Sequence, residues 1–186
     1  MACGPSAAYE PDKINAATKA ATTAIAAEMG AKGELTPRAA TRYTTDSHSE
    51  RGRRPKMEDR HIVVQDFNAF MGLEGMPPQA LFGVYDGHGG LEAAEHVGSQ
   101  LPAAIAAHAA FPTDLSAAVK GGIEEVDSTF LAKAEREALT CGATVVACFI
   151  RGDKLCTAWL GDSQAMLCRA GSAVELMVPH KPERPD

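Results

Sequence analysis

The stretch FGVYDGHGG, Phe82 to Gly90, decides how this chain folds. An apolar run, Ala80 to Tyr85, ends abruptly at Asp86 and is followed by Gly-His-Gly-Gly. The run predicts a buried strand that carries a carboxylate to the point where the backbone turns. Because glycines stand on both sides of His88, the main chain can come close to whatever binds there. The stretch therefore predicts a strand end that carries a binding site.

A second group of charged residues lies upstream of this strand. The short acidic cluster Met57-Glu58-Asp59 falls within a basic stretch that contains Arg53 and Arg54. Carboxylate oxygens are the ligands that hard divalent cations prefer, and arginine side chains bind phosphate. Two carboxylate sites, an imidazole and a pair of arginines therefore indicate a centre for metal ions and phosphate.

The composition is that of an ordinary globular protein, whose 186 residues can enclose one sizeable core. The net charge of −6 argues against non-specific binding to nucleic acid. No apolar run approaches the ~20 residues of a membrane helix, and the N-terminus lacks the pattern of a signal peptide. We therefore expect a cytoplasmic protein, with the nucleus as a second compartment, that binds neither nucleic acid nor membranes. Five cysteines without a C-x-x-C pair are expected to be reduced thiols: Cys3, Cys141, Cys148, Cys156 and Cys168.

Residues 1–41 differ from the remainder and are expected to form an Ala-rich N-terminal extension, disordered in part. The segment Ala16 to Met29 has the composition of a helix, but its apolar face is mostly methyl-sized and would bury little area. Gly30 and Gly33 then interrupt it. A docking helix for a partner protein is the alternative.

The first half of 42–186 is predicted to contain two strands and then two helices. Strands at 61–66 and 81–85 are expected to pair, with a loop at 68–78 between them. Apolar residues at spacings of three and four predict a helix over 91–109, interrupted at Pro102. A second helix is expected to begin at the N-cap Thr113 and to continue to Glu137.

The second half changes to short apolar runs that are separated by turn residues. Strands are predicted at 143–150, 155–160, 165–168 and 174–178, as an antiparallel meander that Gly161-Asp162-Ser163 breaks at one position. Strands, then helices, then further strands predict an α+β fold with helices packed on an antiparallel sheet.

Four motifs resemble those of the PPM-type, metal-dependent Ser/Thr protein phosphatases (type 2C class) and follow that family's order. They are RRPKMEDRH (53–61), FGVYDGHGG (82–90), CGATVVACFI (141–150) and WLGDSQAML (159–167). PHKPER (179–184) adds a likeness to the branch of calcium/calmodulin-dependent protein kinase phosphatases. The resemblance covers about 42–186 and implies a partial four-layer α-β-β-α sandwich of antiparallel sheets flanked by helices.

The resemblance also implies that two Mg²⁺ or Mn²⁺ ions bind at the edge of the sandwich, and it leaves open whether a third ion binds there. The family's later motifs, which contain two further metal-binding aspartates, do not occur in this sequence. We therefore expect 42–186 to be the N-terminal portion of a longer phosphatase domain.

The resemblance and the chemistry of the side chains together assign the metal ligands. Asp86 is expected to bridge two ions from its strand end, and the alternative is an ordinary Asp-Gly turn. Gly87 would offer its main-chain carbonyl, and Glu58 would bind an ion directly or through water. Asp59 would anchor this shell, unless Glu58 and Asp59 are only a solvated acidic pair. Asp162 is either a turn residue or a ligand of a weaker third ion.

Two residues are assigned to the phosphate ester itself. Arg54 is expected to clamp the phosphate, because a guanidinium grips two oxygens with a fixed geometry, although the adjacent Arg53 could be confused with it. His88 is expected to protonate the departing alkoxide, and the alternative is a hydrogen bond to metal-bound water. Ser163 and Cys141 lack the surroundings of a nucleophile, so attack by metal-bound water is expected.

The sequence therefore predicts a phosphatase that removes phosphate from serine and threonine of phosphorylated proteins, with protein kinases as candidate substrates. The alternative is a non-catalytic or truncated relative that acts as a binding module. A nucleotide-hydrolysing enzyme is disfavoured because neither G-x-x-x-x-G-K-[ST] nor a helix-opening G-x-G-x-x-G occurs. The 186-residue chain alone is expected to be poorly active, since the two later aspartates are missing.

Overall fold

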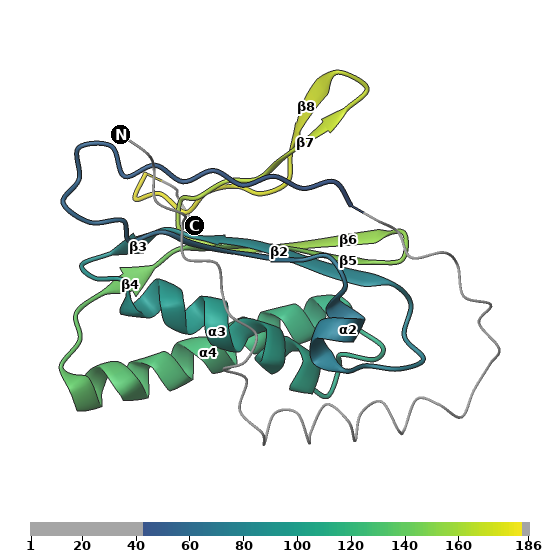
Figure 1. The fold of residues 1–186 in the computed structure, drawn as a ribbon, viewed down its shortest axis with the longest axis horizontal. Helices are drawn as coiled ribbons and strands as arrows, with labels where there is room; N and C mark the ends of the chain where they lie inside the picture. Colours follow the sequence, from purple (N-terminus) through teal and green to yellow (C-terminus); the bar gives the residue numbers. More distant parts are fainter. Residues whose placement is uncertain (1–42, 184–186) are drawn as a thin grey trace.

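The computed structural model describes residues 43–183 as helices packed on one face of an antiparallel sheet (Figure 1). The predicted extension 1–41, its helix at 16–29 and Cys3 lie outside the described residues. Among those that are described, no helix combines the length and the apolarity that crossing a lipid bilayer would require.

The main sheet has four strands in the order β1-β2-β5-β6, all antiparallel to their neighbours. Their bounds are β1 Arg60–Val64, β2 Gln79–Tyr85, β5 Val145–Arg151 and β6 Lys154–Leu160. The predicted pairing of the first two strands is confirmed, and its register places Arg60 opposite Tyr85. Ile62, Leu81 and Tyr85 share the buried face, whereas Val63 and Val84 point the other way and are about half exposed.

Three helices cover the buried face: α2 (Phe67–Met71), α3 (Glu92–Ala107) and α4 (Leu115–Glu137). α3 and α4 lie side by side beneath the sheet in Figure 1. Phe67, Phe111 and Phe149 form the aromatic centre of the core, and each of the three is fully buried.

The structure corrects the prediction in three places along these helices. The expected loop at 68–78 begins as helix α2, because Asp66 is an N-cap that accepts a hydrogen bond from the Ala69 amide at 2.9 Å. The N-cap of α4 is Asp114 and not Thr113, since the Asp114 carboxylate accepts from the Ala117 amide at 3.0 Å. Pro102 lies within the single helix α3 and does not divide it.

The remaining strands are short. β3 (Gly87–His88) pairs with β4 (Gly142–Ala143), and β7 (Met166–Arg169) pairs with β8 (Ser172–Glu175) in a hairpin that projects from the body (Figure 1). The predicted α+β class is confirmed. Thr144 divides the strand expected at 143–150, and β8 ends before the expected 174–178 is complete. The expected sandwich has four layers. Two of them, one layer of helices and one four-stranded sheet, are formed by the described residues.

Candidate metal and phosphate site

A hollow of about 340 Å³ lies where β1 begins and β2 ends. Because Arg60 and Tyr85 are opposite each other in antiparallel strands, the residues just outside this pair emerge at the same edge of the sheet. Those residues are Asp59 and Asp86. The hollow is lined by five of the residues that the sequence predicts for the site: Arg54, Glu58, Asp59, Asp86 and Gly87.

Carboxyl groups lie close together in this hollow. The carboxyl groups of Asp59 and Asp86 are close enough for a hydrogen bond between them, and Asp162 adds a further charge nearby. Partial desolvation, then the charges of Asp59 and Asp162, raise the pKa of Asp86, while His88 opposes the rise. Carboxylates this close to one another favour the binding of a cation, which would relieve their mutual repulsion.

Gly87 lets two backbone segments come into direct contact beside the carboxylates. It is buried, it pairs with Ala143, and a Cβ atom placed on it would collide with the main-chain carbonyl of Glu58. Every residue other than glycine would therefore push the 57–59 segment away from the end of β2.

Thr144 holds Asp86 and brings the Asp162 turn beside it. The Thr144 amide donates to the Asp86 carbonyl at 2.8 Å, and the Asp86 amide donates to the Thr144 hydroxyl at 3.2 Å. The hydroxyl groups of Thr144 and Ser163 lie 2.6 Å apart. Gly161 has a φ of 89° and packs against the Thr144 side chain, so the 161–163 turn lies against the residue that precedes β5.

A tight turn presents Arg54 to the hollow. Gly52 has a φ of 59°, the Arg54 amide donates to the Arg51 carbonyl at 3.2 Å, and Arg51 Nη1 donates to the Pro55 carbonyl at 3.1 Å. Arg54 lines the hollow and Arg53 is not among the lining residues, so the structure separates two arginines that the sequence could not distinguish. Lys56 and Glu50 also line it.

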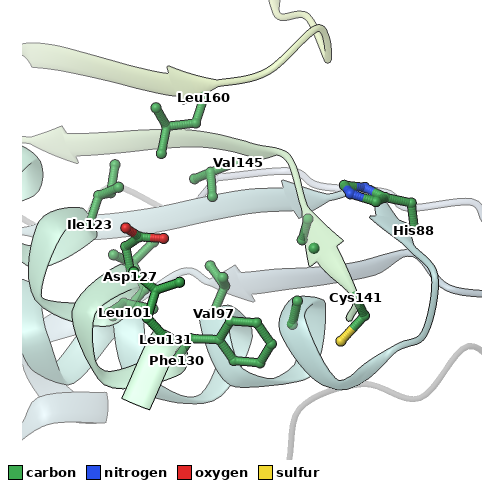
Figure 2. A pocket seen from close by; sticks show the side chains of 14 residues that line it. His88, Val97, Leu101, Ile123, Asp127, Phe130, Leu131, Cys141, Val145 and Leu160 are labelled. Atoms are coloured by element: carbon green, nitrogen blue, oxygen red, sulfur yellow. The ribbon is translucent and has the colours of Figure 1, made fainter. Parts of the chain in front are cut away.

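His88 lies next to this hollow, at the end of a separate cavity of about 270 Å³. Figure 2 shows His88 and Cys141 at one end of this apolar cavity, with Ile123 and Leu160 towards the other. The imidazole is exposed and close enough to Asp86 for their charges to interact. The assignment of His88 as the proton donor stays a prediction.

The donor atoms in the hollow fit a hard divalent cation, because they are carboxylate and carbonyl oxygens. In the described part of the chain, however, no three His, Cys, Asp or Glu side chains are close enough together to form a metal site by themselves. If a cation binds here, these carboxylates would supply only part of its coordination shell, which waters or further ligands would have to complete.

Two further residues organise this site, Arg60 and Thr144, and the sequence alone gives neither of them a role there. Arg60 follows the acidic cluster directly, and its guanidinium lies against the carbonyls of that cluster. In both cases the decisive partners are distant in sequence: Glu95 for Arg60, and Asp86 and Ser163 for Thr144.

Comparison with known proteins places this geometry in context. The family model described as protein phosphatase 2C matches residues 43–186. Protein phosphatase 1E of Mus musculus is 46% identical over 144 residues, and protein phosphatase 1F of Homo sapiens is 40% identical over 163 residues. These alignments cover 77% and 87% of the chain, but only 19% and 36% of the relatives.

A solved structure supports the fold. Serine-threonine phosphatase 2C from Toxoplasma gondii superposes with a TM-score of 0.63 at 22% identity, over 71% of this chain and 48% of that one. A sex-determining protein of C. elegans has the same TM-score at 26% identity, over 70% of this chain and 33% of that one.

Proposed function

Because the chain belongs to the protein phosphatase 2C family, we propose that the whole protein hydrolyses phosphoserine and phosphothreonine in other proteins. Residues 42–186 would be the N-terminal portion of its phosphatase domain, and residues 1–41 an extension before it. The observation that carries the proposal is the convergence of Asp59, Asp86 and Arg54 on one hollow at the sheet edge. Carboxylates beside an exposed arginine suit a phosphate ester held against divalent cations.

The carboxylates of Asp86 and Glu58 and the carbonyl of Gly87 would hold two Mg²⁺ or Mn²⁺ ions, with Asp59 supporting them. Asp162 would serve a third, weaker ion. When bound, such ions lower the pKa of a coordinated water and neutralise charge on the phosphoryl group. The charges of Asp59 and Asp162 both act on Asp86, so the three carboxylates repel one another. Bound cations would remove this repulsion, which supports the assignment.

Arg54 would bind two phosphate oxygens with its planar guanidinium and fix the orientation of the ester. His88, exposed beside Asp86, would give a proton to the serine or threonine oxygen as it leaves. Protein kinases are the proposed substrate class on the branch resemblance of the sequence motifs.

A second candidate is that the 186-residue chain alone is a binding module with little activity. Two observations favour it: no three metal-binding side chains cluster in the described part, and the chain spans 19% and 36% of two relatives. Ions lacking the remaining ligands would bind weakly and dissociate readily.

The test is Mn²⁺-dependent hydrolysis of a phosphothreonine peptide by the whole protein and by the 186-residue chain. We expect turnover by the whole protein and little by the chain alone. Arg54→Lys in the whole protein should lower kcat/KM by about 10²-fold, whereas the matched Arg53→Lys should leave it nearly unchanged. A whole protein without Mn²⁺-dependent turnover would refute the proposed activity, and robust turnover by the short chain would refute the second candidate.

A further inference from the structure

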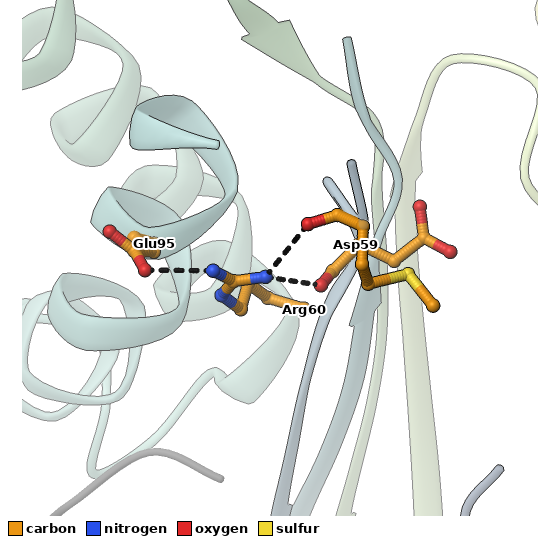
Figure 3. A network of polar contacts seen from close by, with 4 residues as sticks. Asp59, Arg60 and Glu95 are labelled. Atoms are coloured by element: carbon orange, nitrogen blue, oxygen red, sulfur yellow. Dashed lines mark hydrogen bonds and ion pairs between the residues drawn. The ribbon is translucent and has the colours of Figure 1, made fainter. Parts of the chain in front are cut away.

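Arg60 connects the acidic segment of the site to helix α3. Its Nη1 donates to the Asp59 carbonyl at 2.8 Å and, more weakly, to the Met57 carbonyl at 3.5 Å. Its Nη2 donates to Glu95 Oε1 at 2.9 Å. Figure 3 shows Arg60 reaching from the strand towards Glu95 on the helix, while the Asp59 side chain points to the opposite side.

Side-chain alternation explains why Arg60 takes this direction. In the register of β1 and β2, Arg60 lies opposite Tyr85, whose side chain is buried on the face that the helices cover. Successive residues of an extended chain point to opposite faces, so Asp59 and Asp86 point away from the helices. One strand end thus presents a carboxylate on one face and anchors itself through a guanidinium on the other.

The contacts of Arg60 fall on both sides of Glu58. The carbonyls of Met57 and Asp59 accept from Arg60, and the Glu58 carbonyl lies against Gly87. Each of three successive carbonyls is therefore held by a specific neighbour, which leaves the segment little freedom to shift.

The Arg60 side chain is only 16% exposed, and Glu95, at 52% exposed, compensates its charge. This compensation matters because an uncompensated guanidinium would repel a cation bound nearby. Glu95 also lies in the first turn of α3, where the helix dipole favours a negative charge.

We propose that Arg60 is a positioning residue: it fixes the main chain of 57–59 against α3 and so sets where Glu58 and Asp59 meet a divalent cation. The inference rests on the proposed metal-dependent function. Arg60 does not contact the ion, and its effect reaches the ion through the backbone that carries the ligands.

The test is a titration of the 186-residue chain with Mn²⁺, in which electron paramagnetic resonance measures the concentration of the free ion. Arg60→Met keeps the aliphatic stem and removes all three hydrogen bonds, so Mn²⁺ affinity should fall about 10- to 100-fold. Arg60→Lys keeps the charge but not the planar fork, and most of that loss should remain. Glu95→Gln keeps an acceptor and removes only the compensating charge, so its effect should be on the order of threefold.

Lys120→Met is the matched control, because Lys120 forms an exposed ion pair with Glu124 at 3.7 Å, away from the site. It should leave Mn²⁺ affinity unchanged. Amide hydrogen exchange on the metal-free variants gives a second readout. In Arg60→Met the amides of 57–60 should exchange faster while those of α4 do not change.

The outcomes separate this inference from the proposed function. If the unsubstituted chain binds Mn²⁺ and Arg60→Met binds it equally well, the inference is wrong even if the variant melts at a lower temperature. Unchanged exchange at 57–60 in Arg60→Met would also overturn it. If the unsubstituted chain takes up no Mn²⁺, the proposed metal centre of this chain fails, and the role of Arg60 towards an ion fails with it.

Discussion

Asp59 and Asp86 leave neighbouring antiparallel strands at the same edge of the sheet, each one residue beyond the pair that Arg60 forms with Tyr85. Asp59 and Asp86 are 27 positions apart in the sequence, and the register of β1 and β2 brings their carboxyl groups within hydrogen-bonding reach.

Asp86→Asn should stabilise the metal-free chain while weakening Mn²⁺ binding. The raised pKa of Asp86 means that its ionised form is disfavoured in the folded state, and an amide removes that penalty. Because the carboxyl group is largely exposed, the melting temperature at pH 7 should rise by only about 2 °C. Differential scanning calorimetry without metal measures this, with the exposed turn residue Asp153 mutated to Asn as the control. A lower melting temperature for Asp86→Asn would contradict the crowding argument.

Gly87→Ala should destabilise the chain by about 1–3 kcal/mol, because the added methyl group meets the Glu58 main chain, which cannot rotate away. Gly98→Ala in α3 is the matched control. A Cβ atom at Gly98 would lie 3.6 Å from the Tyr85 ring, an ordinary contact, and alanine favours a helix by about 1 kcal/mol. Urea denaturation should therefore show opposite signs for the two variants, and a destabilisation of similar size in both would disprove the specific role of Gly87.

Thr144→Val should cost about 1–2 kcal/mol of unfolding free energy and should also weaken Mn²⁺ binding, since the Asp86 amide loses its acceptor. Ser163→Ala removes only the contact between the two hydroxyl groups and should cost less. Thr157→Val is the control, because the Thr157 hydroxyl donates a long bond of 3.5 Å to the Leu176 carbonyl. Equal losses for Thr144→Val and Thr157→Val would argue against a specific support of Asp86.

Stability should decrease as the pH falls below about 6.5, in part because of His96. Burial between α3 and α4, and then the charge of Lys133, lower the pKa of this imidazole. The unfolded chain therefore takes up the proton first, so the folded state loses stability as the pH drops through the unfolded pKa and on to the folded one. His96 also lies 3.0 Å from the Thr129 hydroxyl. Chemical denaturation between pH 5 and 8 should show a weaker pH dependence for His96→Gln, and an unaltered slope would exclude this contribution.

The sequence predicts the main features of the fold because they rest on local patterns. The apolar run before Asp86 reads directly as a buried strand, and the two helical stripes and the later strand runs are equally regular. The errors occur at the ends of helices and strands, where a single polar residue determines the position at which a helix begins. The sequence predicts Asp66 as the end of a strand, whereas Asp66 is the N-cap of α2. Asp114 caps α4 one residue after the predicted Thr113.

For the candidate site, the sequence motifs predict the residues that line the hollow but not the contacts that support them. The motifs predict Arg54, Glu58, Asp59, Asp86 and Gly87 as site residues, and the structure gathers these five around one hollow. The contacts that support these residues cannot be predicted from the motifs, because a hydrogen bond such as that of Arg60 to Glu95 joins residues whose proximity depends on how α3 packs against the sheet. Linear spacing contains no signal for such a contact.

The register of β1 and β2 also constrains how this region can vary in length. One residue added or removed within either strand would turn every following side chain to the other face and move the carboxylates by about 3.3 Å. Insertions within 72–78, the turn-rich connection between α2 and β2, would leave both strand ends where they are. Insertions and deletions in homologous sequences should therefore occur in that connection. A library of variants with different lengths of 72–78 would keep the proposed ligands in place.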